Sequence, residues 1–84
     1  MEIKENKTRI SLWLKGKRFY KIEPNKLIFT NGYSKHNRNL WETYRFNKID
    51  NCLELLQNCL LERTINISLE EQQYIKKLYI KLFV

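Results

Sequence analysis

The first half of the chain alternates between apolar and polar residues, a pattern that predicts β-strands. Residues 9–14 follow the period of two expected of a strand with one face in the core and the other in water. Three further segments rich in residues that favour strands follow, at positions 18–22, 27–30 and 40–46. Gly16 marks a turn after the first strand, and Glu23-Pro24-Asn25-Lys26 is typical of a type I turn after the second. We therefore expect an antiparallel β-meander of three or four strands.

Beyond residue 47 the apolar residues recur at intervals of three and four, which predicts two helices. The first apolar stripe consists of Ile49, Cys52, Leu53, Leu56, Cys59 and Leu60. The second consists of Ile75, Leu78, Tyr79 and Leu82, and Ser68 with Glu71 has the spacing of a capping box at the start of that helix. An antiparallel sheet can leave one face in water while helices cover the other. We therefore expect an α+β fold with both helices packed on one face of the meander.

The length of 84 residues is enough for one domain and too small for two, so we expect a single domain over residues 1–84. Within it we expect residues 1–7 to fray, residues 8–46 to form a basic β-sheet region and residues 47–84 to form a two-helix region. The charged residues are divided at nearly the same border, between the predicted sheet region and the predicted helices. Up to Lys48 there are twelve Lys and Arg against four Asp and Glu, a balance of +8, and after it four against five, a balance of −1. The net charge of +7 indicates a polyanionic partner, an acidic protein partner or simple solubility.

Residues that could carry catalysis or hold a metal are sparse. His36 is the single histidine and lies in a polar loop, so no base is placed beside a Ser or Cys nucleophile. Cys52 and Cys59 share the apolar stripe of one predicted helix, which makes them core thiols and leaves too few ligands for zinc. We therefore expect no enzyme activity, no cofactor and no metal.

The chain also has no apolar run of the roughly 20 residues needed to span a bilayer, and its first residues do not resemble a signal peptide. We expect a soluble cytoplasmic protein, in the host cytoplasm if a phage encodes it, with no membrane partner.

Basic and aromatic residues are interleaved through the predicted sheet region, a mixture that suits phosphate contacts from the cations and base stacking from the rings. The candidate binding residues are Lys15, Lys17, Arg18, Lys21, Lys35, Arg38, Trp41 and Arg45. Trp41 and Arg45 fall on the same side of the last strand, so they face outward if Tyr44 and Phe46 pack on the helices. The alternative interpretation is that the rings belong to the core and the cations form a solvated rim.

Two adjoining segments carry a resemblance to known proteins: KRFYKIEPNKLIFTNGYSKHNRNLWETYRF and NKIDNCLELLQNCL. A short meander with a polar loop, an aromatic strand and a helix opened by Ser, Asn or Asp resembles the pattern of small uncharacterised phage-encoded α+β proteins. This resemblance implies an origin in a phage or mobile element and carries no catalytic residue to this chain.

A second resemblance concerns architecture alone. A basic sheet backed by a helix is similar to the small DNA-binding domains at the N-termini of phage-type integrases, whose three-stranded sheet enters the major groove. That likeness implies that Trp41, Arg45, Arg18 and Lys21 read the DNA. The second helix, over residues 69–84, departs from the integrase pattern.

Three hypotheses of function follow from these observations. The first is a small non-enzymatic phage or mobile-element protein that inhibits or assists host nucleic-acid machinery, of an anti-defence or anti-CRISPR type, with a host protein or nucleoprotein complex as its partner. The second is a module that binds DNA or RNA directly through the basic, aromatic sheet face. The third is a structural homodimer that associates through surplus apolar residues such as Leu61, Ile80 and Phe83.

Overall fold

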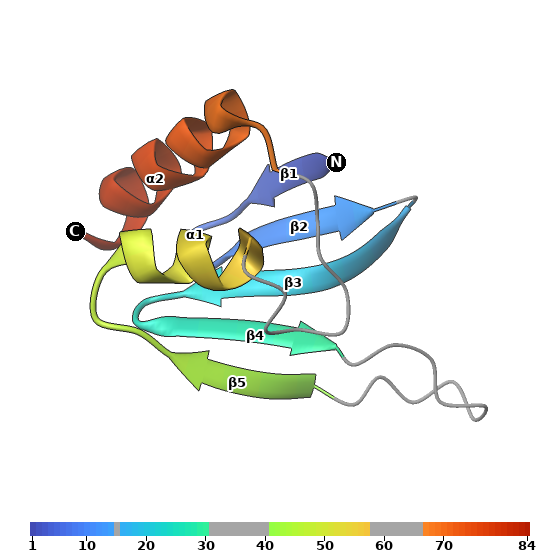
Figure 1. The fold of residues 1–84 in the computed structure, drawn as a ribbon, viewed down its shortest axis with the longest axis horizontal. Coiled ribbons are helices and arrows are strands. Elements are labelled where there is room, and N and C mark those ends of the chain that lie inside the picture. Colours follow the sequence, from blue (N-terminus) through green and yellow to red (C-terminus); the bar gives the residue numbers. More distant parts are fainter. Residues whose placement is uncertain (15, 31–40, 58–66) are drawn as a thin grey trace.

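A computed structural model describes the chain except for residues 15, 31–40 and 58–66 (Figure 1). It shows an α+β fold in which a five-stranded antiparallel sheet is followed by two helices, and each strand pairs with the next along the chain. The strands are β1 (Glu2–Glu5), β2 (Ile10–Leu14), β3 (Lys17–Glu23), β4 (Lys26–Thr30) and β5 (Trp41–Arg45), and the helices are α1 (Ile49–Gln57) and α2 (Leu69–Phe83). The fold class and the meander are confirmed, whereas the expected count of three or four strands is too low.

The additional strand is β1, which lies within the segment that we expected to fray. Ile3 pairs with Leu12 of β2, and its half-buried side chain packs against the core. The other residues of β1 are charged, so the apolar pattern of this segment is too weak to predict a strand. An edge strand needs only one partner strand for its backbone hydrogen bonds, and β2 supplies that partner.

The core lies between one face of the sheet and the two helices. In Figure 1, α1 passes in front of the central strands and α2 lies beside β1, on the same side of the sheet. The most deeply buried side chains are Ile10, Leu12, Ile22 and Leu27 of the sheet and Cys52, Leu56 and Ile75 of the helices. Ile10 and Leu12 follow the predicted period of two, and Cys52, Leu56 and Ile75 belong to the predicted helical stripes. Cys59 and Leu60 of the predicted first stripe lie outside the described residues.

The start of α2 is closed by the predicted capping box. The Glu71 backbone N–H donates to Ser68 Oγ at 3.1 Å, and the Ser68 backbone N–H donates to Glu71 Oε1 at 3.0 Å. Two exposed ion pairs also involve α2, Lys76 with Asp50 of α1 at 3.0 Å and Lys81 with Glu5 of β1 at 3.9 Å. Exposed pairs contribute little, about 0–1 kcal/mol each, so packing of the apolar stripe holds the helix in place.

The turn between β3 and β4 differs from the expected type I turn. Asn25 has a φ of 61°, whereas the third position of a type I turn needs a negative φ. Asn tolerates this left-handed conformation better than most residues. Three hydrogen bonds then fasten the turn: the Phe46 backbone N–H donates to the Asn25 carbonyl, Asn25 Nδ2 donates to the Phe46 carbonyl, and the Asn25 backbone N–H donates to Tyr79 Oη at 3.1 Å. The turn between β3 and β4 is therefore hydrogen-bonded both to Phe46, which follows β5, and to Tyr79 of α2.

Candidate functional site

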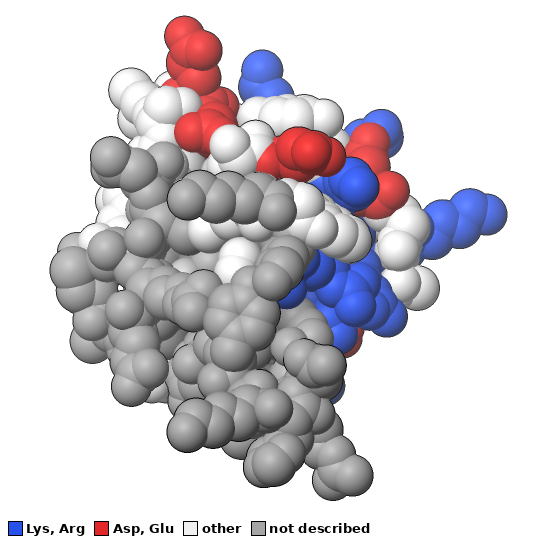
Figure 2. All heavy atoms as spheres, turned by 90° about the vertical axis from the view of Figure 1, so that its right-hand side faces the viewer, with Lys and Arg blue, Asp and Glu red and all other residues white. Residues whose placement is uncertain are grey.

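The face of the sheet that points away from the helices carries five of the basic side chains that the structure describes. We call it the open face, and its side chains come from Glu2, Lys4, Ser11, Trp13, Arg18, Lys21, Glu23, Lys26, Ile28, Thr43 and Arg45. In Figure 2, Lys and Arg atoms gather on the side of the sheet away from α1, and most Asp and Glu atoms lie above them. Five cations against two carboxylates make this face strongly basic.

A β-bulge determines which cations share the open face. Arg18 and Lys21 are three residues apart, and in a regular strand an odd separation places side chains on opposite faces. The register between β2 and β3 shifts between Leu12 and Trp13, so that Leu12 pairs with Tyr20 but Trp13 pairs with Arg18, which leaves Phe19 as the extra residue. The bulge therefore brings Arg18 onto the same face as Lys21.

Two cations of the open face, Arg18 and Lys21, form a cluster with Arg9, which adjoins that face. Lys21 is half-buried, and its pKa is lowered first by desolvation and then by repulsion from Arg18 and Arg9, while Glu23 acts in the opposite direction. Arg9, which immediately precedes β2, is also half-buried, and its Nε has no hydrogen-bond partner in the described part of the chain. Like charges held together and partly out of water repel one another, and a bound anion would offset that repulsion.

Trp13 lies beside this cluster and is held between cations. Lys4 Nζ is 4.2 Å from the centroid of its ring and Arg18 Cζ is 6.0 Å from it, both within the range of cation–π contacts. The indole is half-buried, and its Nε1–H finds no acceptor among the described residues. The open face thus combines an aromatic ring, flanking cations and an indole donor without a partner.

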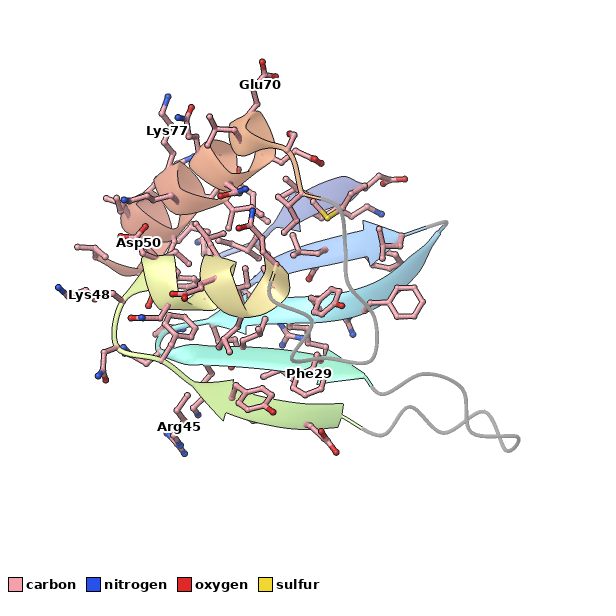
Figure 3. All side chains as sticks on the ribbon, in the orientation of Figure 1. Phe29, Arg45, Lys48, Asp50, Glu70 and Lys77 are labelled. Atoms are coloured by element: carbon pink, nitrogen blue, oxygen red, sulfur yellow. The ribbon has the colours of Figure 1, made fainter. Side chains whose placement is uncertain are left out.

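At the β5 edge of the sheet the open face continues through Arg45. This residue is exposed, pairs in register with Lys26 of β4, and extends away from the strand (Figure 3). On the opposite face of β5, Tyr44 stacks on Phe29 with ring centroids 5.2 Å apart but is still 40% exposed, whereas Phe46 is buried against Tyr79. Of the two aromatic residues expected to pack on the helices, Phe46 therefore does so more completely.

The candidate binding residues named from sequence are only partly brought together. Arg18, Lys21 and Arg45 lie on the open face. Trp41 pairs in register with Thr30 and Lys17 with Leu14, and their side chains lie outside the described part of the structure. Lys15, Lys35, Arg38 and His36 also lie outside the described residues.

Sequence reasoning omitted Lys4, Arg9 and Trp13 from the candidate site. The alternation in residues 9–14 already places Arg9 and Trp13 on the polar side of a strand, and this signal could have found them. Lys4 was omitted because its segment was expected to fray. Ser11, between Lys4 and Lys21 in register, is only 6% exposed, which shows how closely the longer side chains cover the face.

Cys52 is a core thiol, as the helical pattern predicts, and burial raises its pKa to about 12. The folded state holds the proton of the Cys52 thiol more tightly than the unfolded state does. The contribution of this thiol to the free energy of unfolding is therefore complete below pH 9.0 and is lost as the pH rises toward 12. With Cys59 replaced by Ser, we expect thiol reagents to modify Cys52 at least about 100-fold more slowly in native than in denatured protein, because only the thiolate of an opened molecule reacts.

The pH dependence gives a second measurement of the same property. The free energy of unfolding of the Cys59→Ser protein should fall more between pH 8 and pH 11 than that of a Cys52→Ala, Cys59→Ser protein, in which this thiol cannot titrate. Equal losses in the two proteins, or rapid modification of native Cys52, would contradict the burial of this thiol.

Other kinds of site find less support in the described residues. No group of three or more His, Cys, Asp and Glu side chains in this part of the chain could hold a metal ion. Neither α1 nor α2 has the length and apolar character needed to cross a membrane. No protein-family model, curated protein or solved structure matches the chain. The open face is therefore the candidate functional site.

Proposed function

We propose that the protein is a non-enzymatic nucleic-acid-binding module that uses the open face of its sheet. One observation carries this proposal: on a sheet face left uncovered by α1 and α2, the charges of Arg9 and Arg18 act on Lys21, and Trp13 lies beside Arg18. Phosphates would contact the cations, and the release of counterions from the nucleic acid would drive binding.

The arrangement of the cations supports a binding role over a solvated rim. Charges that serve solubility work best when they are exposed and spread among charges of opposite sign. Arg9, Arg18 and Lys21 are half-buried, and the pKa of Lys21 is lowered first by desolvation and then by repulsion from Arg18 and Arg9. A bound polyanion would offset this repulsion, so the cluster suits a binding role.

The two remaining hypotheses, an inhibitor or accessory factor and a homodimer, have less support. A role as an inhibitor or accessory factor for host nucleic-acid machinery, and an origin in a phage, stay predictions. In the homodimer hypothesis, Ile80 is exposed, but Phe83 packs edge-on against Tyr79 with ring centroids 5.1 Å apart and is half-buried. Leu61 lies outside the described residues. Of the apolar residues named for a dimer, Ile80 is therefore available at the surface and Phe83 only in part.

A salt titration tests the proposal directly. We expect micromolar or tighter binding to a fluorescently labelled oligonucleotide at low salt, measured by anisotropy. If three to five phosphates are contacted, the slope of log K against log salt concentration should be about −2 to −3.5 for a single strand. If the anisotropy of the oligonucleotide does not change as protein is added at low salt, the proposal is refuted. Binding without salt dependence would show that the cations of the open face do not make the contacts.

A further inference from the structure

We infer that the open face binds single-stranded nucleic acid, with one base stacked at Trp13, in preference to a duplex. This inference rests on the proposed function and adds the class of nucleic acid. It follows from the width of the sheet, the course of the cations across it and the surroundings of Trp13.

The width of the open face is unsuited to the groove of a duplex. Five strands at a spacing of about 4.8 Å give a sheet roughly 19 Å across, between the outer strands β1 and β5. The major groove of B-DNA is about 12 Å wide and admits a helix or a two-stranded ribbon. Basic residues lie along the whole width, from Lys4 on β1 to Arg45 on β5, so a groove could contact only part of them. The width thus argues against the major-groove reading implied by the integrase likeness.

The cations instead follow a diagonal across the sheet. Arg18 pairs with Trp13 near one end of the β2–β3 hairpin, and Lys21 lies further along β3. Lys26 pairs with Glu23 and with Arg45 at the opposite end of β3, β4 and β5. A path from Arg18 through Lys21 to this last pair is the length of a few nucleotides, which is close to the lower limit of about four nucleotides for single-strand sites on β-barrels. A single strand can follow such a path because its backbone is flexible.

Trp13 provides a place for a base at one end of this path. Among the described residues, the cation nearest its ring is Lys4, which has an exposed side chain and a long ion pair with Glu2 at 3.7 Å. A base can therefore displace the Lys4 ammonium from the ring at little cost, after which Lys4 and Arg18 remain close enough to contact the flanking phosphates. Every base has a π-face, so stacking of this kind tolerates many sequences. A base in a duplex is already stacked on its neighbours and cannot reach the ring.

Competition between single-stranded and duplex oligonucleotides tests the inference with the unmodified protein. An unlabelled single strand of about 12 nucleotides should displace a labelled single strand at a concentration at least tenfold lower than the duplex of the same sequence. Equal competition by the duplex would overturn the inference while leaving the proposed function standing. Binding of neither form would instead overturn the proposed function.

Variants at Trp13 test the stacked base. Trp13→Leu should weaken single-strand binding by about tenfold, whereas Trp13→Phe should recover most of the affinity because it keeps an aromatic ring. Circular dichroism and the midpoint of thermal unfolding would show that both variants are folded. If the Leu and Phe variants bind the single strand equally well, Trp13 does not stack a base and that part of the inference is wrong.

Discussion

Replacing Arg18 and Lys21 together by Gln is expected to weaken nucleic-acid binding by about tenfold to 100-fold while making the free protein more stable. The binding loss follows from removal of two adjacent cations on the open face. The gain in stability follows from the lowered pKa of Lys21, which is caused by desolvation and then by repulsion from Arg18 and Arg9. A lysine whose pKa is lower in the folded state than in the unfolded state destabilises the fold wherever it is protonated, including neutral pH.

The pH dependence of this variant has a definite sign. In the unmodified protein the destabilising effect of Lys21 is complete below its folded pKa and disappears as the pH rises through that value toward 10.5. The stability advantage of the double variant over the unmodified protein should therefore be largest near neutral pH and shrink in alkali. Urea unfolding at several pH values measures it.

A second pair of lysines provides the matched control. Lys76→Gln with Lys77→Gln removes the same charge from α2, on the other side of the sheet from the open face (Figure 3). We expect this control to keep its affinity within about threefold, because distant exposed charges are screened at physiological salt. The salt slope of the Arg18, Lys21 variant should be smaller by about 1.4, or 0.7 for each lost phosphate contact. Equal losses of affinity in both variants would mean that net charge, and not the open face, drives binding.

Most of the fold follows from periodicity, because burial on one face leaves a direct mark on the sequence. The alternation in residues 9–14 predicts the burial of Ile10 and Leu12, while Leu14 is half-buried. In the stripe of Ile75, Leu78, Tyr79 and Leu82, the first three are buried and Leu82 is half-buried. β1 is the exception, since an edge strand with Ile3 as its one apolar residue is specified by backbone pairing with β2. Periodicity records burial and cannot detect pairing.

The candidate site is less predictable than the fold for a related reason. From sequence, Arg18 belongs to the same side of its strand as Tyr20, which is buried in the core. The bulge at Phe19 reverses that assignment and places Arg18 beside Trp13 and Lys21. Bulges depend on the partner strand as well as on local sequence, so the cluster becomes visible only when β2 and β3 are paired.

The second large effect is expected at Tyr79, which joins α2 to the sheet. Its ring packs against Phe46 and Phe83, with centroid separations of 5.8 and 5.1 Å, and its hydroxyl oxygen accepts the backbone N–H of Asn25. Tyr79→Ala should lower the free energy of unfolding by about 3–5 kcal/mol, the usual loss for a buried aromatic side chain. A domain of 84 residues has a total stability of only about 4–13 kcal/mol, so this variant should lose roughly a quarter of it or more.

Tyr79→Phe separates the hydroxyl from the ring. It keeps the aromatic packing and leaves the Asn25 backbone N–H without its acceptor, so we expect a loss of about 1 kcal/mol in urea unfolding. Tyr74→Phe is the matched control on the same helix, because Tyr74 is 47% exposed and the loss should stay within about 0.5 kcal/mol. If Tyr79→Phe is no more costly than this control, the hydroxyl does not fasten the turn. The turn at Asn25 lies between β3 and β4, at the Lys26 end of the open face. If packing of the Tyr79 ring is enough to hold that end of the sheet, folded Tyr79→Phe protein should bind nucleic acid with unchanged affinity.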